Sequence, residues 1–139
     1  MAKTDSVVRV PADSVALQPA RPAVHLVRTL DKFIEASEAT RGVFLPRLSA
    51  LSELAVRTCN SVYEILVVDP HAAKVLVRGG RFFPILTSAV VGGSSLGTSC
   101  LKMRWIGEGF CMEIHADGLT VVTSAVHAIR LTEPARRVA

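Results

Sequence analysis

The chain has 139 residues, half of them apolar, and carries a formal net charge of +4. This length suits one domain with a short tail, and a domain of this size can bury most of a core by itself. The mean hydropathy of +0.39 is high for a soluble chain, yet no apolar run reaches the roughly 18 residues of a spanning helix.

The N-terminus MAKTDSVVRVPADSV lacks the unbroken apolar core of a signal peptide. We therefore expect a cytoplasmic protein that buries its excess apolar surface by self-association, so that the predicted partner is a second copy of the chain. The three cysteines, at 59, 100 and 111, form no CxxC spacing, which agrees with a reducing compartment and predicts neither disulfides nor a zinc site. We expect no metal and no cofactor.

Residues 1–24 contain three prolines and one short β-like run, Ser6 to Val10. Proline at this density blocks helix formation and removes backbone donors, so the pattern predicts an extended or disordered arm.

Residues 25–60 show a helical period that begins after Thr29, and Gly42 and Pro46 interrupt it. The pattern predicts either one helix kinked at Pro46 or two helices joined near Gly42, and the sequence leaves both open. An apolar stripe of this segment is the expected oligomer interface, with Phe33, Ile34, Phe44, Leu48 and Leu51.

The period changes to two over residues 61–132, and residues 133–139 form a tail. Strands are expected at Val62 to Val68, Lys74 to Arg78, Pro84 to Val91 as a sheet edge, and Ala125 to Leu131, with a loop at Gly92 to Ser99. The predicted fold class is α+β: an N-terminal helical segment followed by a small antiparallel β-barrel or rolled sheet of about six strands.

Residues 100–123 predict a meander with two turns. Hydrophobic register in the first hairpin sets Trp105 against Phe110 and Met103 against Met112, with all four side chains in the core. The same register brings Cys100 opposite His115. The second turn, Asp117-Gly118, favours a tight hairpin that sets Val121 against Ile114.

The glycine-rich loop from Gly92 to Ser99 nearly matches the phosphate-binding pattern GxxxxGK[ST], but Thr98 stands at the lysine position. A strand pattern follows the loop, whereas a phosphate loop must open a helix, so nucleotide hydrolysis is disfavoured. The loop also matches part of the [DN]xSxxG motif of PilZ-type cyclic-dinucleotide receptors, through Ser94 and Gly97. Gly92 replaces the acidic or amide residue, and the arginines in RGGR are one residue too close for RxxxR, so no family is assigned.

Three functional hypotheses follow. The favoured one is a non-catalytic, homo-oligomeric scaffold or binding module, for which we assign no catalytic residue. The first alternative is a small barrel that binds nucleic acid or a (cyclic di)nucleotide through Arg78, Arg81, Ser94, Ser95, Gly97, Lys102 and Arg104. The second is a thiol- or metal-dependent enzyme that uses Cys100, Cys111 and His115.

Overall fold

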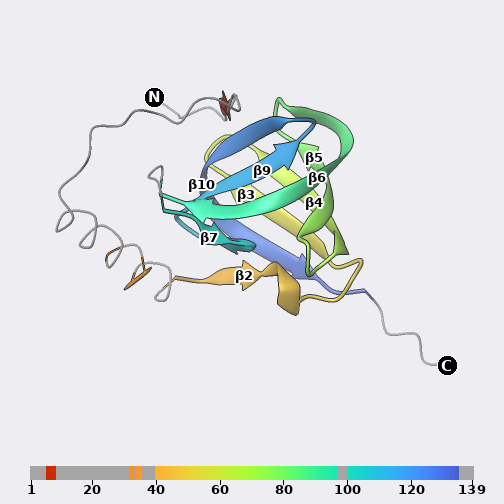
Figure 1. Ribbon diagram of the computed structural model, residues 1–139, viewed down its shortest axis with the longest axis horizontal. Coiled ribbons are helices and arrows are strands. Elements are labelled where there is room, and N and C mark those ends of the chain that lie inside the picture. The colour runs from red at the N-terminus through yellow and green to blue at the C-terminus, as the bar shows by residue number, and fades with distance from the viewer. Residues whose placement is uncertain (1–5, 9–31, 33, 36–39, 97–99, 135–139) are drawn as a thin grey trace.

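The computed structural model describes residues 6–8, 32, 34–35, 40–96 and 100–134 (Figure 1). Almost all of its regular structure is strand. The elements are β1 (Ser6–Val8), β2 (Gly42–Phe44), the 3-10 helix η1 (Leu45–Arg47), β3 (Glu53–Thr58), β4 (Val62–Asp69), β5 (Lys74–Gly79), β6 (Phe83–Ser95), β7 (Lys102–Met103), β8 (Trp105–Gly107), β9 (Cys111–Ala116) and β10 (Leu119–Thr132).

Six of these strands form a closed ring in which every neighbouring pair is antiparallel. The order is β3, β4, β5, β6, β9 and β10, and β10 pairs again with β3. β1 pairs with β10, β7 pairs with β6, and β2 forms a separate two-stranded sheet with β8. The predicted antiparallel β domain is therefore confirmed.

Alternation of apolar and polar residues explains why these segments form strands. Side chains in a strand point to opposite faces in turn, so one set of alternate residues enters the ring and the other faces outward. In β4, for example, Tyr63, Ile65 and Val67 are buried, while their neighbours are exposed or half-buried. The inward sets of all six ring strands meet in one apolar core.

The two longest strands bend because their registers shift. In β6 the pairing with β9 shifts between Val91 and Gly93, and β10 has shifts on both of its sides. Such bulges increase local twist and curvature. Gly93 has φ +147°, and a Cβ there would lie 2.1 Å from the Lys102 carbonyl oxygen, so only glycine allows this close strand approach.

The predicted helical segment is wrong from residue 42 onward, where the chain forms β2, η1 and β3. Pro46 opens only the short 3-10 turn, and the alternation in β3 buries Leu54 and Val56 on one face. Apolar residues at both helical and strand spacings made the two periods hard to separate. Lys32 and two neighbouring described residues have helical backbone, but no α-helix is delimited in the described part of the chain.

The expected interface stripe is dispersed accordingly. Phe33 lies outside the described residues, and Ile34 is exposed. Phe44 and Leu48 are half-buried beside β8 and the ring, whereas Leu51 is exposed with φ +69° in the turn before β3.

The predicted first hairpin is also wrong, because β8 pairs with β2 while β9 pairs with β6 and β10. In the predicted meander β9 would pair with the segment before it, whereas in the structure it pairs with β6, which closes the ring and leaves neither β6 nor β10 with a free edge there. Met103 is consequently 65% exposed, and Trp105 still contacts Phe110 edge to face, with ring centroids 5.2 Å apart. The second hairpin is confirmed, with Val121 opposite Ile114.

Two further boundaries differ from the expectation. Residues 84–91 belong to an interior strand, not an edge, since β6 has β5 on one side and β9 on the other. Gly92 to Ser95 continue that strand instead of forming a loop. Within the described residues, no helix has the length and apolar character needed to cross a membrane.

The difference in burial predicts that two isoleucines contribute unequally to the free energy of unfolding. Ile114 is fully buried in the ring, so Ile114→Ala should lower the free energy of unfolding by about 2–5 kcal/mol. Ile85 is 72% exposed, so Ile85→Ala should change it by no more than about 0.5 kcal/mol. Urea denaturation measures both, and equal losses would contradict the burial assigned to Ile114.

Candidate functional site

The small sheet of β2 and β8 lies against the ring and positions the candidate site. Its register pairs Gly42 with Gly107 and Phe44 with Trp105. Immediately after β2, the Leu45 N–H donates to the Arg104 carbonyl at 2.9 Å. This bond ties the start of η1 to the segment between β7 and β8, although the two segments lie far apart in the sequence.

Trp105, the only tryptophan of the chain, lies across the glycines of this sheet. A Cβ at Gly107 would approach the indole to 2.0 Å, and one at Gly42 would approach it to 2.3 Å. The indole therefore fits only where both residues are glycine. Phe110 packs against its side, and Trp105 is only 5% exposed.

Three cationic groups lie over the aromatic rings of this region. The Lys102 Nζ is 4.4 Å from the Trp105 ring centroid, and the guanidinium carbons of Arg47 and Arg104 are 6.0 Å and 5.8 Å from the Phe44 ring centroid. A cation at these distances is attracted to the negative face of an aromatic ring. Arg104, which has φ +55°, also donates from Nη1 to the His71 carbonyl at 2.9 Å.

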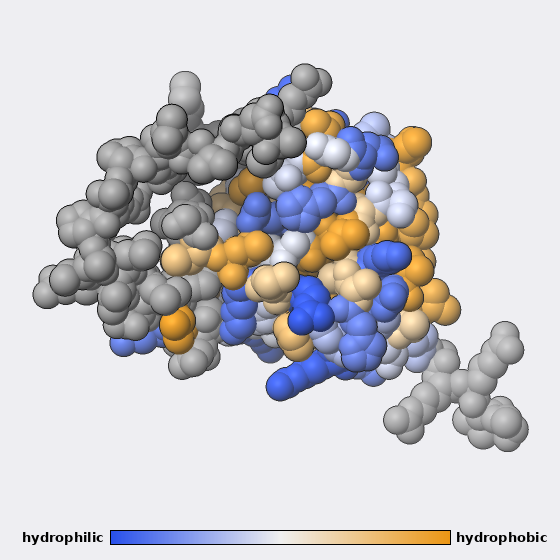
Figure 2. Space-filling view, in the orientation of Figure 1, coloured by the Kyte–Doolittle hydropathy of each residue, from blue (hydrophilic) through white to orange (hydrophobic). Residues whose placement is uncertain are grey.

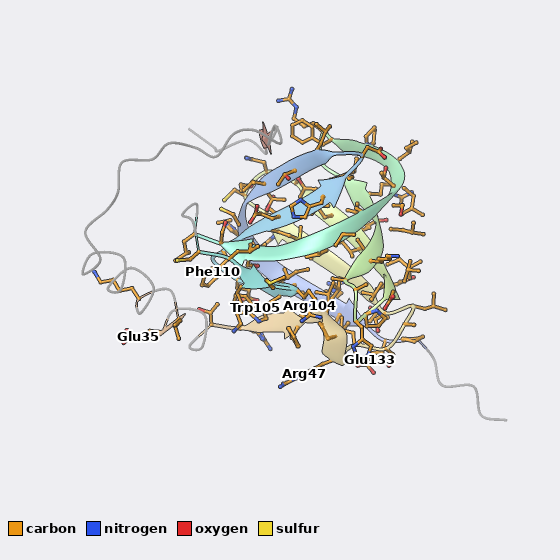
Figure 3. The ribbon with its side chains drawn as sticks, in the orientation of Figure 1. Glu35, Arg47, Arg104, Trp105, Phe110 and Glu133 are labelled. Atoms are coloured by element: carbon orange, nitrogen blue, oxygen red, sulfur yellow. The ribbon has the colours of Figure 1, made fainter. Side chains whose placement is uncertain are left out.

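Two of these cations, Arg47 and Lys102, border a groove of about 560 Å³, which we call the basic–aromatic groove. Figure 3 shows Arg47, Arg104 and Trp105 on the side of the ring where β2 lies. Glu133, just past β10, lies on the same side, but no ion pair joins it to a cation among the described residues. The groove is lined by Gly42, Val43, Phe44, Arg47, Leu48, Lys102, Trp105 and Leu131.

The residues predicted to bind a nucleotide fall into two separate places. Arg78 forms an ion pair with Glu64, and the Arg81 guanidinium carbon lies 5.3 Å from the Phe82 ring centroid. Both arginines are near the start of β6, whereas Lys102 pairs with Ser94, close to the other end of that strand. The structure therefore does not gather the four predicted cations, Arg78, Arg81, Lys102 and Arg104, into one site. Nucleotide binding by this set stays a prediction.

The serines of the same prediction have a structural role. Ser94 is fully buried; its hydroxyl donates to the Trp105 carbonyl at 2.7 Å and accepts from the Gly107 N–H at 3.3 Å. Ser94 thus fixes the backbone of β8 against β6. Ser95 is also buried, and Gly97 lies outside the described residues.

The predicted thiol site is likewise separated. Cys100 packs against the Trp105 and Phe110 cluster, while His115 on β9 lies opposite Val90 and Thr120. The His115 Nδ1 is 2.9 Å from the Thr120 hydroxyl. Cys111 lies four residues before His115 on the same strand, and no group of three potential metal ligands occurs in the part of the chain that the structure describes.

The structure brings together a different thiol and imidazole, which no motif in the sequence pairs. The Cys59 Sγ lies 3.1 Å from the His127 Nε2, and both side chains are exposed. His127 is the extra residue where the pairing of β10 with β3 shifts, so the bulge directs it toward the turn that carries Cys59. No spacing signal could have predicted this contact, because it depends on that bulge.

A second surface lies on the outside of the ring, across β4, β5 and β6. Figure 2 shows apolar residues gathered along that edge of the molecule. The β4–β5–β6 outer face comprises Val62, Glu64, Leu66, Val68, Lys74, Leu76, Arg78, Leu86, Ser88 and Val90. Leu86 is 52% exposed and Val62 53% exposed, so much of this apolar surface faces solvent.

The fit of the indole over the two glycines predicts a specific spectroscopic change. Gly107→Ala should displace Trp105, shift its emission to longer wavelength and raise its quenching by acrylamide. Gly118→Ala is the control, because a Cβ there meets nothing within 4 Å; Gly118, unlike Gly107, has positive φ, so this variant strains the backbone without touching the indole. Equal spectra for Gly107→Ala and the unchanged protein would contradict the packing described above.

Comparison with known proteins adds no functional information to this geometry. No protein-family model matches the chain, and neither the curated proteins nor the solved structures that were searched gave a match. Function must therefore be argued from the surfaces and side chains of this molecule alone.

Proposed function

We propose that this protein is a non-catalytic, homo-oligomeric binding module whose copies join through the β4–β5–β6 outer face. The observation that supports it is the group of exposed apolar side chains on that face, Val62, Val68, Leu86 and Val90, with the half-buried Leu66 and Leu76 among them. Monomeric soluble proteins rarely leave large contiguous apolar patches in water, and such patches often mark protein contacts.

The pattern of the face suits a second copy of the same chain. Leu66 on β4 lies opposite Leu76 on β5, so a short apolar row crosses these two strands and ends at the polar Ser88 of β6. The Glu64–Arg78 pair adds both signs of charge beside that row. In a two-fold contact each copy presents the same patch, so a patch that carries both signs can complement itself.

This proposal moves the expected interface away from the stripe predicted from the sequence. That stripe assumed a helix, whereas Phe44 and Leu48 line the basic–aromatic groove instead. Because the ring pairs its strands on both sides, we place the contact on side chains of the outer face and not on a free sheet edge. The cytoplasmic location stays a prediction.

The native mass in solution tests the proposal. Size-exclusion chromatography with light scattering should give a multiple of the 14.9 kDa chain mass. The double variant Leu76→Glu and Leu86→Glu should shift the protein to the monomer mass, since each change places an unpaired charge in the contact.

Met103→Glu is the matched control, because Met103 is also exposed but lies on β7, away from the outer face. It should leave the native mass unchanged. A wild-type protein that stays at the chain mass at every concentration would overturn the proposal, and so would equal dissociation by the control.

A further inference from the structure

Among the residues that the structure describes, no carboxylate forms an ion pair with the cations that line the basic–aromatic groove. Within residues 40–96 and 100–134 the single ion pair joins Arg78 to Glu64, so neither Arg47 nor Lys102 has a carboxylate partner. Both line the groove, and the lining includes no acidic residue. Two like charges beside one hollow raise the local positive potential and attract an anion.

Both cations lie near aromatic rings before any ligand arrives. Lys102 lies over the Trp105 indole, which the two glycines and Phe110 hold in position. Arg47 ends η1 immediately after Pro46, and its guanidinium lies near the Phe44 ring. A side chain that already has a fixed contact loses less conformational entropy on binding, and Lys102, 4.4 Å from the indole centroid, has such a contact.

The remaining lining is apolar and includes an aromatic ring. Val43, Phe44 and Leu48 are half-buried, and Leu131 lies at the end of β10. The volume of about 560 Å³ falls within the range of about 300–1,000 Å³ that is typical of small-molecule sites. A fitting ligand therefore combines an anionic group with a flat ring of moderate size.

We infer that the basic–aromatic groove binds a nucleotide. The phosphate accepts hydrogen bonds from Arg47 and Lys102, and the base lies against the apolar lining. The guanidinium of Arg47 suits a phosphate because its donors form a planar fork. This binding goes beyond self-association and does not depend on it, since the groove and the β4–β5–β6 outer face are formed by different residues.

Two other hollows of the described structure lack this combination. The hollow on the outer face mixes both signs, with Glu53 and Glu64 beside Arg78 and Arg130. A smaller hollow of about 260 Å³ beside Phe82 is lined by Asp117 and by no cation. An anionic ligand is therefore matched to the basic–aromatic groove.

Isothermal titration calorimetry with AMP and GMP tests the inference. Either nucleotide should bind saturably with one site per chain, and guanosine and inorganic phosphate should each bind at least about tenfold more weakly, because each lacks half of the recognised chemistry. Raising NaCl from about 50 mM to about 200 mM should weaken binding, since the partly exposed cations are screened.

Two variants assign the binding to the groove. Arg47→Met and Lys102→Met each remove one charge while keeping an apolar stem, and each should weaken nucleotide binding at least about tenfold. Arg57→Met removes the same charge from an exposed position on β3 and should leave the affinity unchanged. Unchanged urea midpoints establish that all three variants remain folded.

Three outcomes would overturn the inference: phosphate alone binding as tightly as GMP, equal loss of affinity in Arg57→Met, or binding of a single-stranded oligonucleotide without binding of mononucleotides. The native mass is a separate measurement. A monomer that binds GMP through Arg47 and Lys102 would support nucleotide binding while removing the proposal of self-association.

Discussion

The position of β9 between β6 and β10 is the constraint on which the rest of the structure depends. With this strand in place, each ring strand has two hydrogen-bonded neighbours, so the buried backbone groups are paired. The same pairing places Met112 and Ile114 in the core and fixes the register of both partners, because a slip by one residue would turn these side chains outward.

Ring closure also determines where the candidate surfaces form. Since β9 does not pair with the segment before it, β8 is free to pair with β2, and Trp105 then lies over Gly42 and Gly107. That arrangement places Lys102 over the indole and forms one wall of the basic–aromatic groove. On the other side, the alternation that fills the core leaves the β4–β5–β6 outer face with both apolar and charged side chains.

Local signals predicted part of this structure correctly. The alternation in β4 and β5 and the Asp117-Gly118 turn gave the right strands and the right pairing of Val121 with Ile114, because each depends on residues close in sequence. The helical stripe around Phe44 was wrong, because spacing alone could not show that this residue pairs with Trp105 far along the chain. The sequence pattern points to Lys102 and Arg104 as candidate binding residues but not to Arg47, because Arg47 lies in the segment with the helical period.

Proton contacts across β9 distinguish this ring from the local hairpin that the sequence suggests. Facing residues of antiparallel strands have Cα atoms about 4.5–5.5 Å apart, a distance that nuclear Overhauser spectroscopy detects through nearby protons. Closure by β9 predicts backbone contacts between Val91 and Ile114 and between Ser94 and Met112. Contacts between Met103 and Met112 in their place would contradict the ring and, with it, the groove.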